Sequence, residues 1–498
     1  MGSWSKYRIF VLLWLLTALY IAFLPTRHYT ADAVNNLTYL EAHNVFESWH
    51  SQHLLGLKPG EWVYALSGLR AWQAMRIAQA LMGGLTVALL YLGLQELTQR
   101  RWLPIVCGLC LWLSYGFWHY SSDPDIYSIG YVAVALLMWS YVRYLRAPSN
   151  NRVIVLGLSA AFALLSHQIN VELAGLIGLS LMIGAFRKQT NLPINWRHVI
   201  FYATFSLLPT IVLYVLSWLI VSHAFAQQGT ASPAFFEWLL RYFRSADSGQ
   251  ATWGISFGLS TLPTAIYTLL SSWILVPLLA SASVWQLIPI GIFAVLIIVL
   301  LIRMVVTLIA ADTVERYILW ICVVTLIANG ISGWWWQTGN IKFYLFMQIN
   351  VIYLVGLYTS KRLNNAPILH NPDLILALAA LLMLLAFHVT LTLPFETLGG
   401  VFEVAAHLTD DKIVVAFQDP YQSRILPYIT ANKALILPAD FCSALPSNTD
   451  QAVLWVVRQD AVAQCPLLAS ATEISRFQVD RTRVIWSLLD MTSSVQTK

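Results

Sequence analysis

The chain has 498 residues, of which 58% are hydrophobic and only 11% are charged, and its mean hydropathy is +0.65. Soluble globular proteins carry about 25% charged residues, so this composition excludes a soluble enzyme and predicts a polytopic membrane protein. The formal net charge of +5 comes largely from Lys and Arg in short loops, so it reports orientation in a membrane and predicts no nucleic-acid partner.

About eleven apolar runs are long enough to cross a bilayer as helices, since a crossing takes about 17–25 residues. In chain order they cover about 8–24, 72–95, 102–119, 126–145, 152–167, 169–186, 197–222, 284–302, 316–333, 343–359 and 374–394. The first run lacks a small-residue cleavage site and further spans follow it, so we expect a retained anchor. These runs predict an all-α polytopic membrane domain over residues 1–394.

Basic residues in the loops predict the orientation, because cytoplasmic loops are enriched in Lys and Arg. Lys6 and Arg8 place the N-terminus in the cytoplasm. Further cytoplasmic loops are marked by Arg100, Arg101, Arg143, Arg146, Arg152, Arg187, Lys188, Arg197, Lys361 and Arg362. We therefore expect an integral protein of a bacterial inner (plasma) membrane, with its N-terminus in the cytoplasm and its C-terminal part outside.

The stretch 255–280 is apolar enough to cross, but a full crossing would place Lys361 and Arg362 outside. It also contains Pro263 and Pro277, and proline interrupts helices. We therefore expect a re-entrant or interfacial segment, packed against protein, within an outer loop over 223–283. The alternative is that this stretch crosses and a weaker span does not.

Two regions outside the bilayer are large. In the first loop, about 25–70, Val34, Leu37, Val45 and Trp49 share one face at helical spacing, which predicts a loosely amphipathic helix along the interface. The tail, 395–498, has β-rich runs at 412–417, 434–438, 452–457 and 484–489. Helix-compatible segments separate these runs, so we expect a small extracytoplasmic α/β domain.

Asp32, Asp123 and Asp125 all fall on the outer side of this topology. Asp32 follows the first span, and Asp123 and Asp125 lie in the sequence SSDPDIYS between the third and fourth spans. Taken alone, Asp32 is better explained as a helix N-cap, a position that Thr30 suits as well. A Ser-Ser-Asp-Pro turn explains Asp123, and an acidic residue at a helix start suits Asp125. Because carboxylates are rare in so apolar a chain, their convergence on one side predicts a binding or catalytic site.

Further polar candidates lie near the same face. His119 and Tyr127 flank the acidic pair, and such rings are typical both of sugar sites and of interfacial belts. His167 and Glu172 sit at a break between two apolar runs, LLSHQINVE. Ionisable residues at membrane depth indicate function, although pairing with each other would satisfy them structurally.

Cations on the outer side are few, and a phosphate-bearing ligand would need them. The candidates are Arg76 near the outer end of the second span, Arg241 and Arg244 in the loop after the seventh span, and Lys342 in WWWQTGNIKFYLF. A solvated loop explains Arg241 and Arg244 as well, and snorkelling explains Lys342.

Metal use stays open from the residues. The sequence has no HExxH motif, and its histidines do not reach metal-ligand spacing, so we expect no structural zinc site. Asp32, Asp125 and His167 could ligate a divalent cation or only form hydrogen bonds. No other cofactor is indicated.

Taken together, these features resemble the GT-C class of membrane glycosyltransferases, close to the protein O-mannosyltransferase and aminoarabinose transferase group. The resemblance rests on TADAVNNLTYLEA, FWHYSSDPDIYSIG and LLSHQINVE, and on NIKFYLF, which is similar to that group's Arg-Tyr-Leu-Leu-Pro run. It implies that Asp32 is the general base on the acceptor, that Asp125 shapes the site and that Lys342 contacts the lipid-linked phosphate. The first loop here has a single Asp followed by Ala, and the late motif lacks its proline.

The resemblance implies a membrane glycosyltransferase that moves a sugar from a polyprenyl-phosphate donor to a lipid, glycan or protein acceptor at the extracytoplasmic face. The alternative is a transporter or flippase of a lipid-linked or polar solute, although transporters more often show internal symmetry and midplane charges. A third interpretation is a non-catalytic assembly partner whose tail binds another envelope protein.

Overall fold

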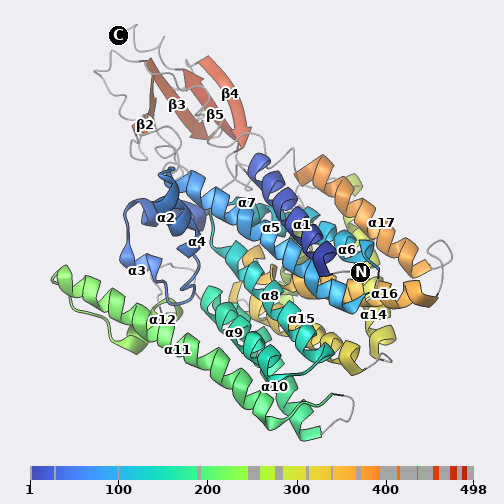
Figure 1. Ribbon diagram of the computed structural model, residues 1–498. Coiled ribbons are helices and arrows are strands. Elements are labelled where there is room, and N and C mark those ends of the chain that lie inside the picture. Colours follow the sequence, from blue (N-terminus) through green and yellow to red (C-terminus); the bar gives the residue numbers. More distant parts are fainter. Residues whose placement is uncertain are drawn as a thin grey trace.

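The structure is a computed structural model, and it describes residues 3–26, 30–98, 100–187, 192–244, 258–274, 284–309, 313–337, 340–365 and 372–392. It also describes five strands in the tail. The long helices form one bundle, and the strands lie outside that bundle (Figure 1).

The helical part agrees with the spans predicted from hydropathy. The long helices are α1 (Ser3–Phe23), α5 (Ala71–Leu97), α8 (Tyr127–Arg146), α10 (Val171–Arg187), α11 (Trp196–Gln227), α14 (Val284–Ile309), α15 (Thr313–Gln337) and α16 (Met347–Asn365). Within the described ranges, eight helical segments are long and apolar enough to cross a membrane. Shorter apolar helices, α6 (Trp102–Leu113), α9 (Asn150–Ser166) and α17 (Pro372–Phe387), account for the other predicted spans.

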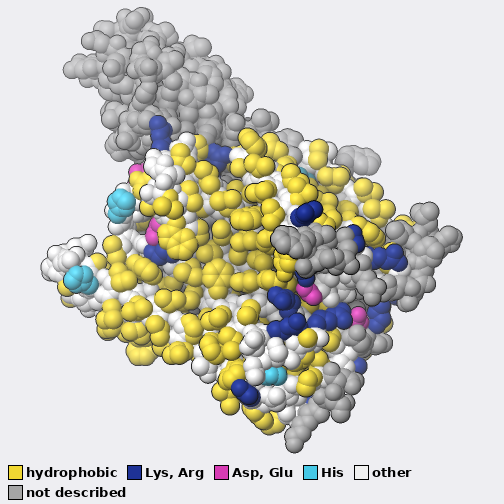
Figure 2. Space-filling model, in the orientation of Figure 1, with side chains coloured by type: hydrophobic (Ala, Val, Ile, Leu, Met, Phe, Trp, Pro, Cys, Tyr) yellow, Lys and Arg dark blue, Asp and Glu magenta, His cyan; other side chains and the backbone are white. Residues whose placement is uncertain are grey.

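Helix α5 is the centre of the bundle, because it packs against α1 on one side and α8 on the other. The close approach of α1 to α5 requires glycine at position 84, because a Cβ at Gly84 would collide with the backbone carbonyl of Trp14 in α1. Helix α11, by contrast, is exposed along most of its length. Hydrophobic side chains cover most of the face in Figure 2, and Lys and Arg gather where Figure 1 marks the N-terminus. Such a surface is expected of a protein solvated by lipid.

The third predicted span is broken in the structure, which corrects the expectation of a continuous helix over 102–119. Helix α6 ends at Leu113, Ser114 is extended, and α7 (Tyr115–Ser122) follows. The amides of Tyr115 and Gly116 donate hydrogen bonds to the carbonyls of Trp273 and Ser272, at 2.9 and 2.8 Å. A break in a membrane helix is tolerated when a neighbour satisfies the freed backbone groups.

That neighbour belongs to the stretch predicted to be re-entrant. Its described part holds α13 (Leu262–Ser271), a helix of 10 residues. Such a helix is too short to cross a bilayer, and its carbonyls bond to protein as expected for a packed segment. Pro277 and the rest of this stretch beyond residue 274 lie outside the described residues.

The first loop differs from the predicted interfacial helix. It forms α2 (Ala31–Glu41), α3 (Val45–Ser48) and α4 (Lys58–Ser67), and His43 interrupts the first two with a φ of 47°. Val34 and Leu37 are fully buried, and Leu37 packs with Leu57 and Met75. The prediction of one continuous helix was wrong, because the segment is divided into α2 and α3. The apolar face of α2 packs on protein, and a position along the membrane interface stays a prediction.

The tail strands are β1 (Lys412–Val415), β2 (Ala434–Leu435), β3 (Ala452–Arg458), β4 (Thr472–Gln478) and β5 (Ile485–Asp490). They form one sheet in the order β2-β1-β3-β5-β4, in which β1 is parallel to β2 and β3, and β5 is antiparallel to β3 and β4. The segments between the strands lie outside the described residues. An α/β domain over 395–498 therefore stays a prediction.

Candidate active site

Thr30 joins the first loop to the second outer loop. It is the N-cap of α2, because its backbone is extended and its Oγ1 accepts a hydrogen bond from the Ala33 amide at 3.2 Å. Its own amide donates to Asp123 Oδ2 at 3.2 Å, and its hydroxyl donates to Asp125 Oδ2 at 3.1 Å. Asp32 lies in the first turn of α2 and is not the cap, so the capping explanation of Asp32 was wrong.

Asp125 is held rigidly in the turn between α7 and α8. Its amide donates to the carbonyl of Asp123 at 2.7 Å, and its Oδ1 accepts from the Ile126 amide at 2.7 Å. The Gln79 side chain of α5 donates to the Asp125 carbonyl. Both acidic side chains of this turn are fully buried. The turn chemistry predicted for Asp123 is therefore present, and it also fixes the Asp125 carboxylate.

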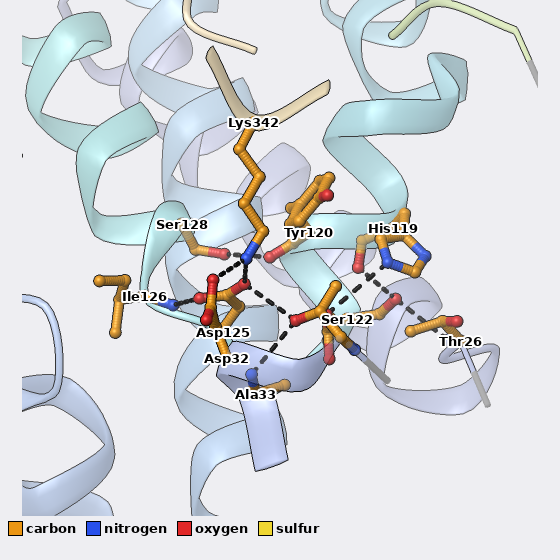
Figure 3. Close-up of polar contacts among 12 residues, drawn as sticks. Thr26, Asp32, Ala33, His119, Tyr120, Ser122, Asp125, Ile126, Ser128 and Lys342 are labelled. Atoms are coloured by element: carbon orange, nitrogen blue, oxygen red, sulfur yellow. Dashed lines mark hydrogen bonds and ion pairs between the residues drawn. The ribbon is translucent and has the colours of Figure 1, made fainter. Parts of the chain in front are cut away.

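Lys342 connects the two acidic segments. It belongs to a 3₁₀ turn (Ile341–Tyr344) that precedes α16, and its Nζ contacts Asp32 Oδ2 and, at 2.8 Å, Asp125 Oδ2 (Figure 3). The same Nζ lies 5.2 Å from the ring centroid of Tyr127 and 5.8 Å from that of Tyr120. Three residues singled out from distant sequence motifs thus meet at one ammonium group.

A cavity of about 260 Å³ opens beside this cluster. It is lined by Asp32, Asn35, Asn36, Tyr39, His50, His53, Leu57, Asp125, Ile126 and Tyr127. The Asp32 side chain is 62% exposed, whereas that of Asp125 is fully buried. Asp32 is therefore the carboxylate that a bound molecule would meet first.

The electrostatics distinguish the acidic groups. The Lys342 ammonium lowers the pKa of Asp32 below its usual value, so this carboxyl is ionised at neutral pH. Burial, and then the neighbouring Asp125, raise the pKa of Asp123 well above its usual value. Burial also lowers the pKa of His53 to about 3, which leaves its imidazole uncharged.

Other predicted residues surround the cluster without lining the cavity. His119 is fully buried, with its Nε2 3.7 Å from Asp123 Oδ2. The buried ring of His167 packs on His53 and Tyr127, with centroids 4.3 and 5.1 Å apart. Glu172 accepts hydrogen bonds from Asn329 and Ser332, so the structural alternative, in which His167 and Glu172 pair with each other, was wrong.

The remaining predicted cations are not part of the described site. The Arg76 guanidinium donates to the Ala22 carbonyl at 3.4 Å and lies over the Trp72 ring. Arg241 and Arg244 belong to α12 (Phe235–Arg244), and their side chains lie outside the described residues. Of the predicted outer cations, Lys342 is therefore the one that the described structure places at the site.

Several residues near the cluster escaped the sequence analysis. Thr30 was considered only as a cap, and Tyr120, His50 and His53 were not singled out. The histidines lie three residues apart in the first outer loop, and this spacing in an apolar chain was a usable signal. Tyr120 gave no such signal, because its approach to Lys342 depends on how α7 packs.

The residues present do not fit a divalent cation. Lys342 places an ammonium against both carboxylates, where a metal ion would have to lie. Among the described residues, no group of three or more His, Cys, Asp or Glu side chains is arranged to hold a metal. No chemical step at this site is therefore assigned to a metal.

Comparison with solved structures identifies the fold. The chain is similar to ArnT from Cupriavidus metallidurans bound to undecaprenyl phosphate, over 97% of this chain and 98% of the other, with a TM-score of 0.55 and 14% identity. The fold is that of the GT-C glycosyltransferases. The GT-C likeness extends to ArnT in its apo state, with the same coverage and score, and to the apo Archaeoglobus fulgidus oligosaccharyltransferase. The latter match covers 88% of this chain and 66% of that chain, with a TM-score of 0.50 and 14% identity. No family model and no curated protein matches the sequence.

Proposed function

We propose that this GT-C-fold protein is a membrane glycosyltransferase, which moves a sugar from a polyprenyl-phosphate donor to a hydroxyl-bearing acceptor at the extracytoplasmic face. The observation that carries the proposal is the pairing of Asp32 and Asp125 with Lys342 beside a cavity. An exposed carboxylate that lines the cavity, and a buried cation that contacts this carboxylate, are the two kinds of group that such a transfer uses.

Asp32 is the proposed general base. An acceptor hydroxyl that hydrogen-bonds to an ionised carboxylate passes its proton to that carboxylate as it attacks the anomeric carbon. The pKa of Asp32 is lowered, so the carboxylate is available at neutral pH. Asp125 is buried and bonded to Thr30 and Ile126, which suits it to positioning Lys342 rather than to proton transfer.

Lys342 is the proposed contact of the donor phosphate. As the acceptor oxygen bonds to the anomeric carbon, the bond from that carbon to the phosphate oxygen breaks, and the polyprenyl phosphate leaves with the electron pair. A preorganised ammonium stabilises the leaving phosphate. When the donor phosphate also binds the Lys342 ammonium, its negative charge offsets part of the positive charge near Asp32. The pKa of Asp32 then rises, and Asp32 becomes a stronger base.

The test compares Asp32→Asn with Glu61→Gln in the full chain. Asn keeps the shape of the side chain and removes the base, so we expect transfer to fall at least about 100-fold. Glu61 pairs with Lys58 in the same loop and does not line the cavity, so Glu61→Gln should retain transfer. The readout is sugar transfer from a synthetic polyprenyl-phosphate hexose or pentose in detergent, with expression and membrane insertion checked for both variants.

Normal transfer by Asp32→Asn would remove the base assignment. Counterflow of the lipid-linked sugar in proteoliposomes without any glycosylated product would favour the transporter alternative. A stable envelope-protein partner of the tail, together with indifference to Asp32→Asn, would favour the assembly alternative.

A further inference from the structure

A second cavity, of about 350 Å³, lies between α10 and α15. It is lined by Ser180, Ile183, Arg187, Thr313, Arg316, Tyr317, Trp320 and Ile321. None of its lining residues is among the predicted site residues, and the proposed transfer reaction does not involve this cavity. Its lining combines two guanidinium groups with apolar and aromatic side chains.

The cavity lies at the far end of this helix pair from the Asp32 site. The two helices run antiparallel, because Glu172 near the start of α10 bonds to Ser332 near the end of α15. Arg187 ends α10 and Thr313 begins α15. From Glu172 to Arg187 the helix rises about 22 Å, most of the thickness of a hydrocarbon core. The cavity therefore opens at the opposite membrane surface, which the loop charges predict to be cytoplasmic.

The two arginines are free to hold an anion. Arg187 and Arg316 are both exposed, and no ion pair joins either of them to a carboxylate within the part of the chain that the structure describes. The adjacent acid, Glu315, is turned to Lys361, with its Oε2 3.8 Å from the lysine Nζ. Thr313 lies at the N-terminus of α15, where the helix dipole adds a partial positive charge.

The apolar side of the cavity indicates what kind of anion it takes. Ile183 lies one turn deeper than Arg187 and is 40% exposed, and Trp320 lies one turn deeper than Arg316 and is 57% exposed. A free inorganic anion would gain nothing from these exposed apolar walls. A phospholipid has its phosphate at the level of the arginines and its first acyl carbons at the level of Ile183 and Trp320.

We propose that this cavity binds the headgroup of an anionic phospholipid from the cytoplasmic leaflet. Arg187 and Arg316 hold the phosphate through charge-assisted hydrogen bonds, and Ile183 and Trp320 contact the upper part of the acyl chains. Inorganic phosphate carries the same anionic group as the lipid headgroup, so it is the competing ligand for this cavity.

The test is native mass spectrometry of the full-length protein titrated with phosphatidylglycerol and, separately, with phosphatidylcholine. We expect the wild type to bind phosphatidylglycerol at least about fivefold more tightly, since anionic headgroups favour basic pockets at this membrane surface. Arg187→Gln/Arg316→Gln should weaken phosphatidylglycerol binding about tenfold or more, as expected for the loss of two charged contacts.

The matched control is Arg146→Gln/Arg197→Gln, which removes the same charge from two exposed arginines that do not line the cavity. This control should change binding less than about twofold, because screened surface charges contribute little. Equal losses in the two double variants would overturn the proposal.

Two of the measurements use only the wild-type protein, so they test the proposal even if a variant fails to fold. Equal affinity for phosphatidylcholine and phosphatidylglycerol would overturn the proposal. Millimolar inorganic phosphate that displaces phosphatidylglycerol would identify a soluble anion as the ligand and overturn the lipid assignment. Retention of phosphatidylglycerol in that competition would support it. None of these outcomes depends on sugar transfer, so this site and the Asp32 site are tested separately.

Discussion

Lys342 is the residue that links the two acidic segments of the site. Its ammonium group is buried and contacts two carboxylates that come from different outer loops. Removing one partner of such a cluster leaves the others uncompensated, which costs more than an exposed ion pair contributes. Loss of the Lys342 charge would therefore affect both the positions of Asp32 and Asp125 and the pKa of Asp32.

A Lys342→Met variant should shift the pH dependence of transfer. The ammonium lowers the pKa of Asp32, so its removal raises that pKa and protonates the proposed base at higher pH. We expect the acidic limb of kcat/KM to move upward by about one pH unit or more, the size of shift that a neighbouring opposite charge produces. The measurement is kcat/KM for transfer between pH 4 and 8, at whatever residual rate the variant retains. Lys361→Met, at the far end of α16, should leave the limb in place.

At the residue scale, sequence reasoning found the groups that an apolar chain has no other reason to contain. Asp32, Asp125 and Lys342 were recognisable because ionisable residues are scarce and topology placed them on one side. His53 and Tyr120 were missed, because their approach to the cluster depends on tertiary packing. Arg76 was also a candidate, but its guanidinium donates a hydrogen bond to the Ala22 carbonyl.

At the scale of elements, the start of α2 decides where Asp32 points. Thr30→Ala removes the cap of α2 and the hydroxyl that bonds Asp125. We expect a loss of about 1–2 kcal/mol in the free energy of unfolding, together with reduced transfer, since a cap is lost and a buried acceptor loses a donor. Thermal unfolding in detergent and a transfer assay measure the two effects.

The matched control for Thr30→Ala lies in the same helix. The Thr38 hydroxyl donates only to the Val34 carbonyl within α2, at 3.1 Å. Thr38→Ala should therefore leave both stability and transfer nearly unchanged. Equal effects of the two variants would show that Thr30 does not position the site.

Helix α1 is held against α5 by the absence of a side chain at Gly84. In a Gly84→Ala variant the new methyl group would meet the backbone carbonyl of Trp14, which cannot rotate away. We expect a loss of about 1–3 kcal/mol, typical of overpacking, seen as a lower unfolding midpoint. Gly175→Ala places its methyl group in open space on α10 and should not lower the midpoint.

Hydropathy predicted the elements well and their interruptions poorly. Every predicted span contains a helix, because lipid requires continuous apolar segments with internally satisfied backbones. The break at Ser114 was invisible, since its polar backbone groups are satisfied by Ser272 and Trp273, more than 150 residues later. The burial of Val34 and Leu37 against protein was not predicted either, because an amphipathic pattern does not reveal whether lipid or protein covers the apolar face.

At the scale of the whole molecule, the orientation of the chain in the membrane determines on which side both proposed sites lie. If the loops with many arginines are cytoplasmic, Ser67 in α4 faces the outside and Asn151 at the start of α9 faces the inside, and both are exposed. In a chain whose native cysteines are replaced, Ser67→Cys should react with an impermeant maleimide in intact cells. Asn151→Cys should react only after permeabilisation, and the reverse pattern would contradict the proposed topology.

The length of α11 has a mechanical consequence. Its 32 residues extend about 48 Å, and a tilt of 40° still leaves about 37 Å along the bilayer normal, against a hydrocarbon core of about 30 Å. One end must therefore project, and the exposed hydrogen bond between Gln227 and His223 suits the outer end to water. Near that end, Val221 packs with Leu54 and with Trp238 of α12. A mismatch between this helix and the bilayer therefore acts on an element that packs against Leu54, next to His53 in the first outer loop.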